Sequence, residues 1–537
     1  MTQTQAESPA RLKKEAGRRR TFAIISHPDA GKTTLTEKLL LYGGAIHLAG
    51  SVKARRAARH ATSDWMKMEQ ERGISVTSSV LHFDYAGFRL NLLDTPGHQD
   101  FSEDTYRALV AADSAVMLLD NRKGVEEQTR KLFAVCRRRR LPIFTFVNKC
   151  DRAGEDPLQL LDDVERDLDI KCYPVTWPIR DGTRFLGVLD RASGKVHLFE
   201  KGADHGQSRT EAQIVDANDP VLLDLLPSGA LETMEEEVAL LDAVGATMDE
   251  AAVRSGELSL TFFGSALTNF GVEPFIKHFL AHAPPPASRE TSTHEIIQPT
   301  DPEFSGLVFK IQANMDPKHR GQVAFVRIVS GRYEPGMTVN IPRTDQRLRL
   351  AAPQQLMARE RVSLEEAWPG DVVGVVDRGS LRVGDSLSTQ PGVEFTGMPR
   401  FSPEHFASVK MEDAMKRKHL DRGLRQLAEE GTIQLLYAES LTGPIPIVGA
   451  VGMLQFDVLL ARLDAEYGVT ARLEPLPYRV ARWVVGPEAR MRAVGTAIGR
   501  KLVEDAGGKP MVLFETEWSL QRAAEGEKEL RFHDVRP

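Results

Sequence analysis

The spacing of apolar and polar positions gives the first part of the chain one consistent pattern. Short apolar runs predict buried strands, and amphipathic segments such as residues 125–140 predict the helices between them. Strands that alternate with helices in this way are typical of a parallel α/β sheet. The apolar runs that end in polar groups or turns are residues 22–25, 91–94, 115–120, 144–147 and 262–263.

The pattern changes after the proline-rich linker at residues 284–286. Up to residue 398, short apolar runs are separated by glycine turns, which predicts a β-barrel. Beyond it, a helix, two strands and a second helix predict a ferredoxin-like α+β unit. These four elements are expected at residues 411–430, 432–437, 447–451 and 454–467, and no internal repeat is visible in the sequence.

The chain is therefore expected to be multidomain: an α/β domain at 1–286, a β-barrel domain at 300–398 and an α+β C-terminal domain at 400–537. A length of 537 residues agrees with roughly one domain per 100–200 residues. Between Asp151 and Ser265 lie far more residues than one crossover helix needs. We therefore expect an inserted subdomain at about residues 177–256, made of antiparallel strands and acidic helices.

The first predicted strand leads into a phosphate-binding loop (P-loop). Backbone N–H groups of such a loop hold phosphate oxygens, and Gly31 lets the backbone approach them. Lys32 supplies a charge to the β- and γ-phosphates, and the Thr33 hydroxyl is placed to bind Mg²⁺. The motif usually begins with Gly, and this chain has Ser there. The candidate residues are Ser26, His27, Pro28, Asp29, Ala30, Gly31, Lys32, Thr33 and Thr34.

Polar groups also follow three later strands of the predicted sheet. After residue 93 come Asp94, Thr95, Pro96, Gly97 and His98, in which Asp94 can hold Mg²⁺ through water and the Gly97 N–H can sense a γ-phosphate. We expect these groups to gather at one edge, because strand ends of a parallel sheet carry the ligand groups.

The remaining two strand ends point to guanine rather than adenine. Asn148, Lys149 and Asp151 follow one strand, and the Asp151 carboxylate can accept from both N1–H and the 2-amino group of guanine. Ser265, Ala266 and Leu267 form a small-residue loop that can support the base. The expected ligands are GTP or GDP with Mg²⁺.

Taken together, these motifs resemble those of the translational GTPases, and the resemblance runs from about Arg18 nearly to the C-terminus. Within that family they are more similar to the members that act on class-one release factors than to elongation factors. The stretches that carry this likeness are the P-loop with its initial Ser, and residues 63–66, 312–320 and 448–457.

The resemblance implies a ribosome-dependent GTPase of translation termination that stimulates the dissociation and recycling of class-one peptide chain release factors. It implies that His98 orients the attacking water and that Ser75 joins Thr33 and Asp94 around Mg²⁺. The implied partners are the ribosome, both its RNA and its proteins, and the class-one release factors.

Three alternatives remain open on the sequence. An elongation-type translocase carries further domains, whereas only about seventy residues follow Tyr467 here, which we expect to be too few for a long arm. A P-loop kinase or ATPase is disfavoured by Asn148, Lys149 and Asp151. A non-enzymatic RNA-binding module is disfavoured by His98.

Composition and charge limit the partners and the cellular compartment that the sequence predicts. A net charge of −6 argues against non-specific coating of nucleic acid, although a local basic face is compatible with it. Residues 318–320, Arg327 and Arg332 predict either an RNA-facing rim or a solvated face. The basic run at 13–20 predicts either contact with RNA or, as the favoured interpretation, a solvated tail that leads into the first strand. Three irregularly spaced cysteines fit a reducing compartment. We expect a cytoplasmic monomer that does not enter a membrane.

Overall fold

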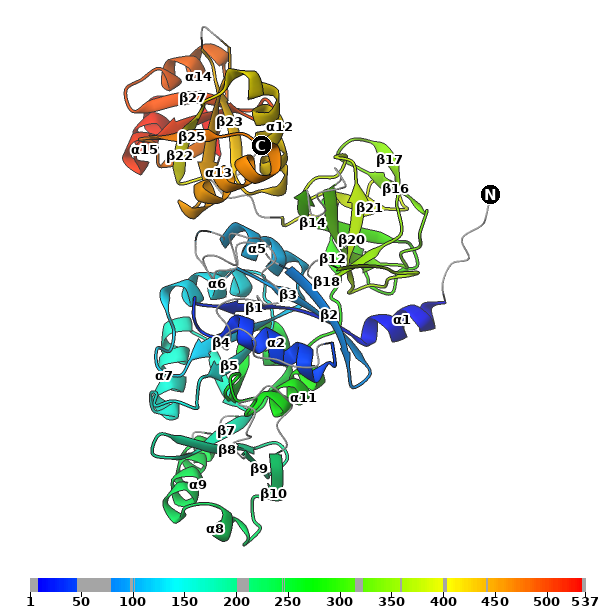
Figure 1. The fold of residues 1–537 in the computed structure, drawn as a ribbon, viewed down its shortest axis with the longest axis vertical. Helices are drawn as coiled ribbons and strands as arrows, with labels where there is room; N and C mark the ends of the chain where they lie inside the picture. The colour runs from blue at the N-terminus through cyan, green and yellow to red at the C-terminus, as the bar shows by residue number, and fades with distance from the viewer. Residues whose placement is uncertain are drawn as a thin grey trace.

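The computed structural model describes residues 8–45, 79–96, 100, 102–199, 212–243, 245, 247–313, 322–357, 360–398, 403–440 and 443–533. Along the long axis, an α/β domain occupies the middle, an antiparallel subdomain lies at one end and the C-terminal domain at the other (Figure 1). The strands of the barrel domain lie beside the α/β domain and the C-terminal domain.

The α/β domain is built on a seven-stranded sheet in the order β2-β3-β1-β4-β5-β11-β6. All its pairs are parallel except β2 with β3. The crossovers therefore bring all the predicted ligand-bearing strand ends to one edge. The strands are β1 (Arg19–Ser26), β2 (Ser79–Tyr85), β3 (Phe88–Asp94), β4 (Ser114–Asp120), β5 (Ile143–Asn148), β6 (Lys171–Pro174) and β11 (Leu258–Phe263).

Helices cover both faces of this sheet because alternate strand residues point to opposite sides. In β4, Ala115 and Met117 belong to the apolar cluster under α5, α6 and α7, whereas Val116 and Leu118 belong to the cluster under α2 and α11. The helices are α2 (Lys32–Tyr42), α5 (Ser102–Ala111), α6 (Glu127–Arg138), α7 (Pro157–Leu168) and α11 (Val272–His282).

The basic run before β1 is not the solvated tail that the sequence predicted. Residues Pro9–Gly17 form helix α1, whose N-cap Ser8 accepts from the Arg11 N–H. Arg19 is buried, and its guanidinium donates to the backbone carbonyl and carboxylate of Glu15, each at 2.7 Å. Arg19 also contacts Asp371 of the barrel domain, whereas Lys13 and Lys14 are exposed on α1. A charge pattern alone does not distinguish the buried cations from the solvated ones.

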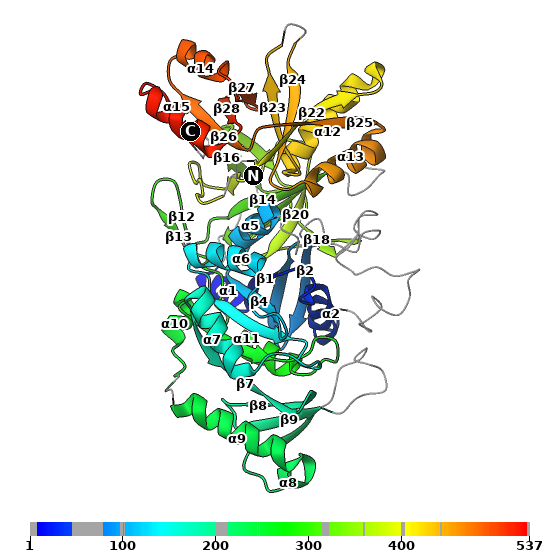
Figure 2. The same cartoon turned by 90° about the vertical axis from the view of Figure 1, so that its left-hand side faces the viewer.

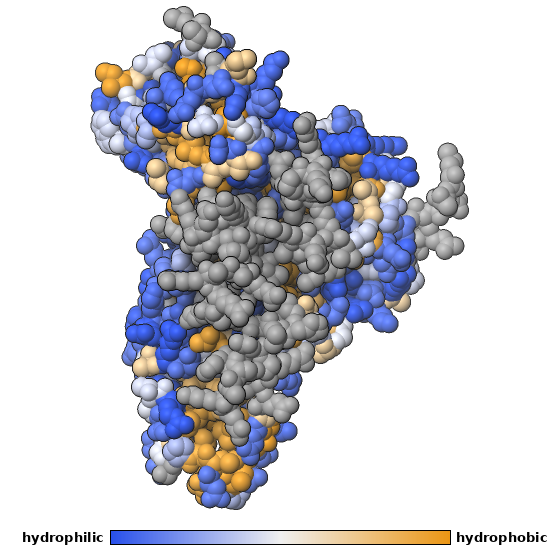
Figure 3. All heavy atoms as spheres, viewed as in Figure 1, coloured by the Kyte–Doolittle hydropathy of each residue, from blue (hydrophilic) through white to orange (hydrophobic). Residues whose placement is uncertain are grey.

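The inserted subdomain has an antiparallel sheet in the order β10-β9-β8-β7, as the alternating pattern predicts. Trp177 of β7 joins this subdomain to the seven-stranded sheet. The indole N–H donates to Glu237 of α9 at 2.7 Å, and the indole ring contacts Phe263 of β11 edge-on, with 5.3 Å between the ring centroids. The elements are β7 (Thr176–Asp181), β8 (Arg184–Asp190), β9 (Lys195–Phe199), β10 (Ala212–Asp216), α8 (Leu222–Leu225), α9 (Ser228–Ala243) and α10 (Glu250–Ser255). Figure 3 shows apolar surface at this tip, where Ile214, Leu223 and Leu240 are exposed.

The barrel domain is an antiparallel eight-stranded sheet in the order β17-β16-β21-β14-β15-β20-β18-β19, folded around one apolar core. Its strands are β14 (Ser305–Ala313), β15 (Gln322–Ser330), β16 (Thr338–Ile341), β17 (Gln346–Arg349), β18 (Gln354–Met357), β19 (Glu360–Ser363), β20 (Val372–Asp377) and β21 (Ser386–Ser388). A two-stranded ribbon, β12 (Arg289–Glu290) with β13 (Ile296–Ile297), precedes it.

Neither prediction for Arg327 is correct, because this side chain lies neither on an RNA-facing rim nor on a solvated face. It is fully buried and donates to Asp113 and Thr21 of the α/β domain, at 2.5 and 2.6 Å. Arg332 is partly buried beside Glu334 and Glu366. Residues 318–320 lie outside the described residues.

The C-terminal domain contains the predicted unit: β22 (His405–Met411), α12 (Arg417–Glu430), β23 (Gln434–Ala438), β24 (Ile445–Ala450), α13 (Leu454–Tyr467) and β25 (Ala471–Leu476), with a short 3₁₀ turn at Ala414–Lys416. A second set follows: β26 (Val480–Val485), α14 (Glu488–Gly495), β27 (Arg500–Asp505), β28 (Pro510–Phe514), α15 (Glu517–Gly526) and β29 (Arg531–His533). Figure 2 shows both sets in one layered body.

Both sets have the β-α-β-β-α-β order, and they join into one sheet, β25-β22-β24-β23-β27-β28-β26-β29. The pairing of β23 with β27 makes the join. The structure thus contains a topological repeat where the sequence showed no repeat. The residues after Tyr467 supply β25, the last strand of the first set, and the whole second set, which lies in the same sheet.

Candidate nucleotide-binding site

The carboxyl ends of β1, β3, β4, β5 and β11 meet at one edge of the sheet. The register pairs Asp120 with Asn148, Ile24 with Asp94, and Phe263 with Val147. Loops that are far apart in the sequence therefore face each other across this edge, which is the place where open α/β sheets bind ligands.

The P-loop occupies the turn between β1 and α2. Gly31 has φ of 103°, and a Cβ at this residue would lie 2.3 Å from the Asn148 side-chain nitrogen. Any larger residue would therefore be strained twice, by its backbone conformation and by this contact. Glycine here lets the loop lie close against Asn148 of β5, and α2 begins at the next residue, Lys32.

Asn148 connects two loops of the site. Its Nδ2 donates to the Ala30 carbonyl and its Oδ1 accepts from the Ala266 N–H, both at 2.8 Å. One buried amide thus fixes the distance between the P-loop and the loop of Ser265, Ala266 and Leu267. The sequence identified Asn148 as a binding residue, and the structure adds this bracing contact.

Lys149 reaches back under the P-loop. It has φ of 66°, and its ammonium donates to the Asp29 carbonyl and to Asp120 Oδ2, the latter at 2.7 Å. Burial raises the pKa of Asp120, but hydrogen bonds from Lys149 and the Arg122 N–H outweigh it, so the pKa is lowered overall. Asp120 is a member of the site that the sequence analysis missed; its only signal was an acid at a strand end.

Asp151 and Ser265 lie together although 114 positions separate them. The Ser265 hydroxyl donates to Asp151 Oδ1 at 2.6 Å, and the Cys150 N–H donates to the Gly264 carbonyl at 3.1 Å. The hydroxyl orients the carboxylate, and the backbone hydrogen bond joins the two loops. This gives Ser265 a positioning role in addition to the expected support of a base.

Lys32 and Asp94 form an ion pair beneath the P-loop. Both side chains are buried, with 8% and 2% of their surfaces exposed, so their mutual charge compensation matters. The Thr95 hydroxyl donates to the Ile24 carbonyl at 2.7 Å, and the Pro96 carbonyl accepts from Thr105 of α5. These bonds attach the start of the loop after β3 to the sheet and to α5.

Other predicted residues are placed as follows. His27 contacts Glu126 at 3.2 Å, and Glu126 is the second residue of the site that the sequence analysis missed. Pro28, Thr33 and Thr34 are partly buried. The Ser26 hydroxyl is buried without a hydrogen-bond partner among the described residues. Gly97, His98 and Ser75 lie outside the described residues.

Three family models match the chain: the elongation factor Tu GTP binding domain at residues 17–285, elongation factor G domain 2 at 303–390, and the C-terminal domain of class II release factor RF3 at 395–524. The fold and this edge therefore define a GTPase of the translation-factor class, one that binds guanine nucleotides.

Relatives called "Peptide chain release factor 3" extend over nearly the whole chain. One from Microcystis aeruginosa is 52% identical over 97% of this chain and 95% of its own length. One from Symbiobacterium thermophilum is 54% identical over 95% of this chain and 96% of its own length. The chain belongs to the peptide chain release factor 3 family and is a translation-termination GTPase.

A solved structure from Thermus thermophilus is similar in fold, with a TM-score of 0.68 at 25% identity. The match covers 92% of this chain and 72% of the other.

In the part of the chain that the structure describes, no helix has the length and apolar character needed to cross a membrane.

Proposed function

We propose that this protein hydrolyses GTP on the ribosome and thereby speeds the departure of class-one peptide chain release factors. The observation that carries the proposal is the Asp151 carboxylate, oriented by Ser265 on the same sheet edge as the P-loop. A fixed carboxylate suits the two adjacent N–H donors of guanine. Relatives named for peptide chain release supply the biological setting.

In this proposal the P-loop amides and Lys32 bind the phosphates. The expected nucleotide contacts comprise the loop from Ser26 to Thr34, the loop from Asp94 to His98, the Asn148, Lys149 and Asp151 group, and the Ser265, Ala266 and Leu267 loop. Phosphoryl transfer of this kind depends mainly on positioning and charge stabilisation.

The residues present fit Mg²⁺. The buried Asp94 carboxylate and the Thr33 hydroxyl are hard oxygen donors, and no cluster of three acids, histidines or cysteines occurs among the described residues. Mg²⁺ in nucleotide sites is held by one or two protein ligands together with phosphates, rather than by an all-protein cage. Thr33, Ser75 and, through water, Asp94 are the proposed ligands, and the ion would neutralise charge on the phosphates.

His98 is proposed to orient the attacking water. Replacing it with Ala should leave GTP affinity unchanged and sharply reduce ribosome-stimulated turnover, because an interaction made only in the transition state does not contribute to ground-state binding. Single-turnover phosphate release measures this. Equal turnover in both proteins would remove His98 from the mechanism.

The proposed partners are ribosomal RNA and proteins together with the class-one release factors. A GTP-bound factor that prefers one ribosome conformation shifts the equilibrium only by its differential affinity for the two states. A release factor that prefers the other state then dissociates faster. We propose that the protein works as a cytoplasmic monomer, which fits its three free, buried cysteines.

The test loads ribosomes with a fluorescent class-one release factor after peptide release. We expect its off-rate to rise when this protein and GTP are added, and phosphate release to need ribosomes. An unchanged off-rate rejects the termination role. Movement of messenger RNA by one codon would instead favour the elongation-type alternative.

A further inference from the structure

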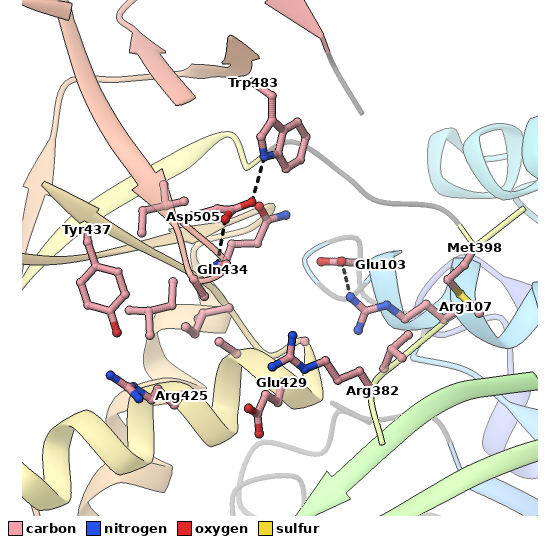
Figure 4. Close-up of a pocket in the computed structure, with 18 residues that line it drawn as sticks. Glu103, Arg107, Arg382, Met398, Arg425, Glu429, Gln434, Tyr437, Trp483 and Asp505 are labelled. Atoms are coloured by element: carbon pink, nitrogen blue, oxygen red, sulfur yellow. Dashed lines mark hydrogen bonds and ion pairs between the residues drawn. The ribbon is translucent and has the colours of Figure 1, made fainter. Parts of the chain in front are cut away.

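A cavity of about 420 Å³ lies where the three domains meet, away from the P-loop (Figure 4). Its wall carries both signs of charge equally, since three acids and three arginines line it: Glu103, Glu429, Asp505, Arg107, Arg382 and Arg425. A balanced wall of this kind selects no charged ligand. The charged pair whose place does point to a function lies instead within the nucleotide site, where Asp120 contacts Lys149.

Asp120 is the last residue of β4, and the turn that follows holds its side chain in place. Its Oδ1 accepts from the Arg122 N–H at 2.9 Å, and its backbone carbonyl accepts from the Lys123 and Gly124 N–H groups at 3.0 and 2.9 Å. Only 5% of the residue is exposed. The second carboxylate oxygen, Oδ2, accepts from the Lys149 ammonium at 2.7 Å.

The same turn is attached to the loop after β5. The Asn121 N–H donates to the Asn148 carbonyl, and the Asn121 carbonyl accepts from the Glu155 N–H, both at 2.9 Å. A Cβ at Gly154 would lie 2.0 Å from the Asn121 side-chain nitrogen, so the two segments fit closely. Backbone contacts therefore bring the carboxylate and the ammonium together, and the pair does not depend on two flexible side chains alone.

Lys149 connects this turn to the P-loop. Its ammonium also donates to the Asp29 carbonyl, and both Lys149 and Asp29 have φ of 66°. A non-glycine residue in this left-handed region is unfavourable unless its surroundings hold it there. Without the Asp120 carboxylate, the ammonium loses its ionic contact in the site, and the two strained residues lose part of what holds them.

We propose that Asp120 is a positioning residue of the nucleotide site, which acts through Lys149 to hold the P-loop in the form that binds the phosphates. Asp120 itself does not touch the nucleotide. Its loss lets bound GDP and GTP leave faster, because affinity differences within one kind of site lie mostly in the dissociation rate. The inference deepens the proposed function and rests on the nucleotide contacts assigned there to the P-loop and Lys149.

Dissociation of fluorescent GDP from the full-length protein is the measurement. Asp120→Asn keeps the size of the side chain and removes its charge. We expect the dissociation rate to rise about tenfold, a factor that corresponds to about 1.4 kcal/mol.

Asp190→Asn is the matched control. Asp190 also ends a strand, β8, and its Oδ1 accepts from the Ala192 N–H at 3.0 Å. Its Oδ2 contacts a different partner, His278 of α11, at 3.0 Å. This substitution therefore removes a similar carboxylate outside the nucleotide loops and should leave the dissociation rate unchanged.

A double-mutant cycle tests the path through Lys149. Lys149→Met should also speed dissociation, and adding Asp120→Asn to it should change the rate no further, since both substitutions remove the same contact. If Asp120 only stabilised the fold, Asp120→Asn would lower the free energy of unfolding and leave the dissociation rate of the folded protein unchanged.

Base selection separates Asp120 from Asp151. Inosine triphosphate lacks the 2-amino group of guanine, which is assigned to the Asp151 carboxylate. The ratio of the affinities for GTP and inosine triphosphate should therefore be the same in Asp120→Asn and in the wild-type protein, whereas Asp151→Asn should change it.

Equal dissociation rates in Asp120→Asn and Asp190→Asn would overturn the proposal, as would additive effects in the cycle or an altered nucleotide ratio in Asp120→Asn. Wild-type protein that binds neither GDP nor GTP would instead reject the nucleotide site itself, and this inference with it. The two failures are therefore distinguishable.

Discussion

Asn148 illustrates how one side chain sets the geometry of the site. Its side-chain NH₂ donates to the Ala30 carbonyl, and its side-chain oxygen accepts from the Ala266 N–H. The P-loop and the loop after β11 are thus tied together before any ligand is considered. A buried amide with both ends satisfied stabilises one arrangement and disfavours others.

Asp151→Asn should exchange guanine for xanthine specificity. The amide can donate to the oxygen that replaces the 2-amino group, and it can no longer accept from both donors of guanine. We expect GTP affinity to fall about a hundredfold, as the loss of hydrogen bonds to a charged group costs roughly 1.5–3 kcal/mol each. Displacement of a fluorescent nucleotide by GTP or xanthosine triphosphate measures it, with Asp181→Asn at the exposed end of β7 as control. Unchanged GTP affinity contradicts the assignment.

His82 should make stability sensitive to acid. Burial, then the nearby Arg89, lowers the pKa of this histidine to about 4, from an ordinary 6.5. The native state therefore holds the neutral ring. Its stabilising contribution is complete above pH 6.5 and is lost as the pH falls from 6.5 towards 4. Between pH 7.5 and pH 5 the free energy of unfolding should drop by about 2 kcal/mol from this group.

Urea denaturation at the two pH values provides the measurement. In His82→Asn this part of the drop should disappear, because the Asn amide keeps a donor for Asn91 but cannot titrate. His419→Asn, on the exposed surface of α12, should retain the wild-type drop. The same pH dependence in both variants would show that His82 is not responsible.

At the scale of elements, the turn before β20 fits against β1 with almost no space. Gly370 has φ of 101°, and a Cβ here would lie 2.6 Å from Pro286 and 3.0 Å from the Arg19 side chain. Its carbonyl accepts from Thr21, Asn91 and Arg327. The close approach of this turn therefore brings the barrel domain onto the α/β domain.

Gly370→Ala should destabilise the protein by about 2–4 kcal/mol, from the positive φ and from the contacts that must give way. Gly379 is a matched control: it has φ of 104° and nothing within 4 Å of the added Cβ. Gly379→Ala should therefore cost only about 1–2 kcal/mol. Chemical denaturation compares the two, and equal losses would mean that the contact with Pro286 and Arg19 has no effect.

At the scale of the whole molecule, a buried polar cluster joins the α/β and barrel domains. Arg327 donates to Asp113 and Thr21, and Arg19 contacts Asp371 at 2.8 Å. Charged groups of this kind resist separation because each would lose a buried partner. The interface therefore contains buried polar pairs beside apolar contacts, such as those in the cluster of Val110 with Leu307 and Val329.

Arg327→Met should weaken this join, since it leaves Asp113 buried beside an apolar side chain. We expect a loss of about 3–5 kcal/mol and separate unfolding of the two domains. Differential scanning calorimetry should then show the transition split or broadened. Arg347→Ala, at an exposed position of β17, serves as control. An unchanged single transition in Arg327→Met contradicts the assigned role of the cluster.

The sequence by itself predicted the elements and the chemistry that local patterns encode. Apolar runs found the buried strands, and α13 begins and ends where its periodicity predicted, at Leu454 and Tyr467. Motifs of a few consecutive residues indicated the P-loop and a guanine-specific site, because short-range backbone geometry and ligand chemistry depend on neighbouring residues. The family resemblance that these motifs carried was confirmed.

Only the tertiary structure decided which residues pair across long distances. Arg327 lies in a buried cluster instead of on a basic rim, and the basic run before β1 forms most of helix α1. The Ser265 hydroxyl donates to Asp151, and the last residues repeat the order of the preceding fold unit. These outcomes depend on burial and on partners far away in the chain. A charge or an amide looks the same in the sequence whether it meets water or a buried partner, and its free energy differs by several kcal/mol between the two.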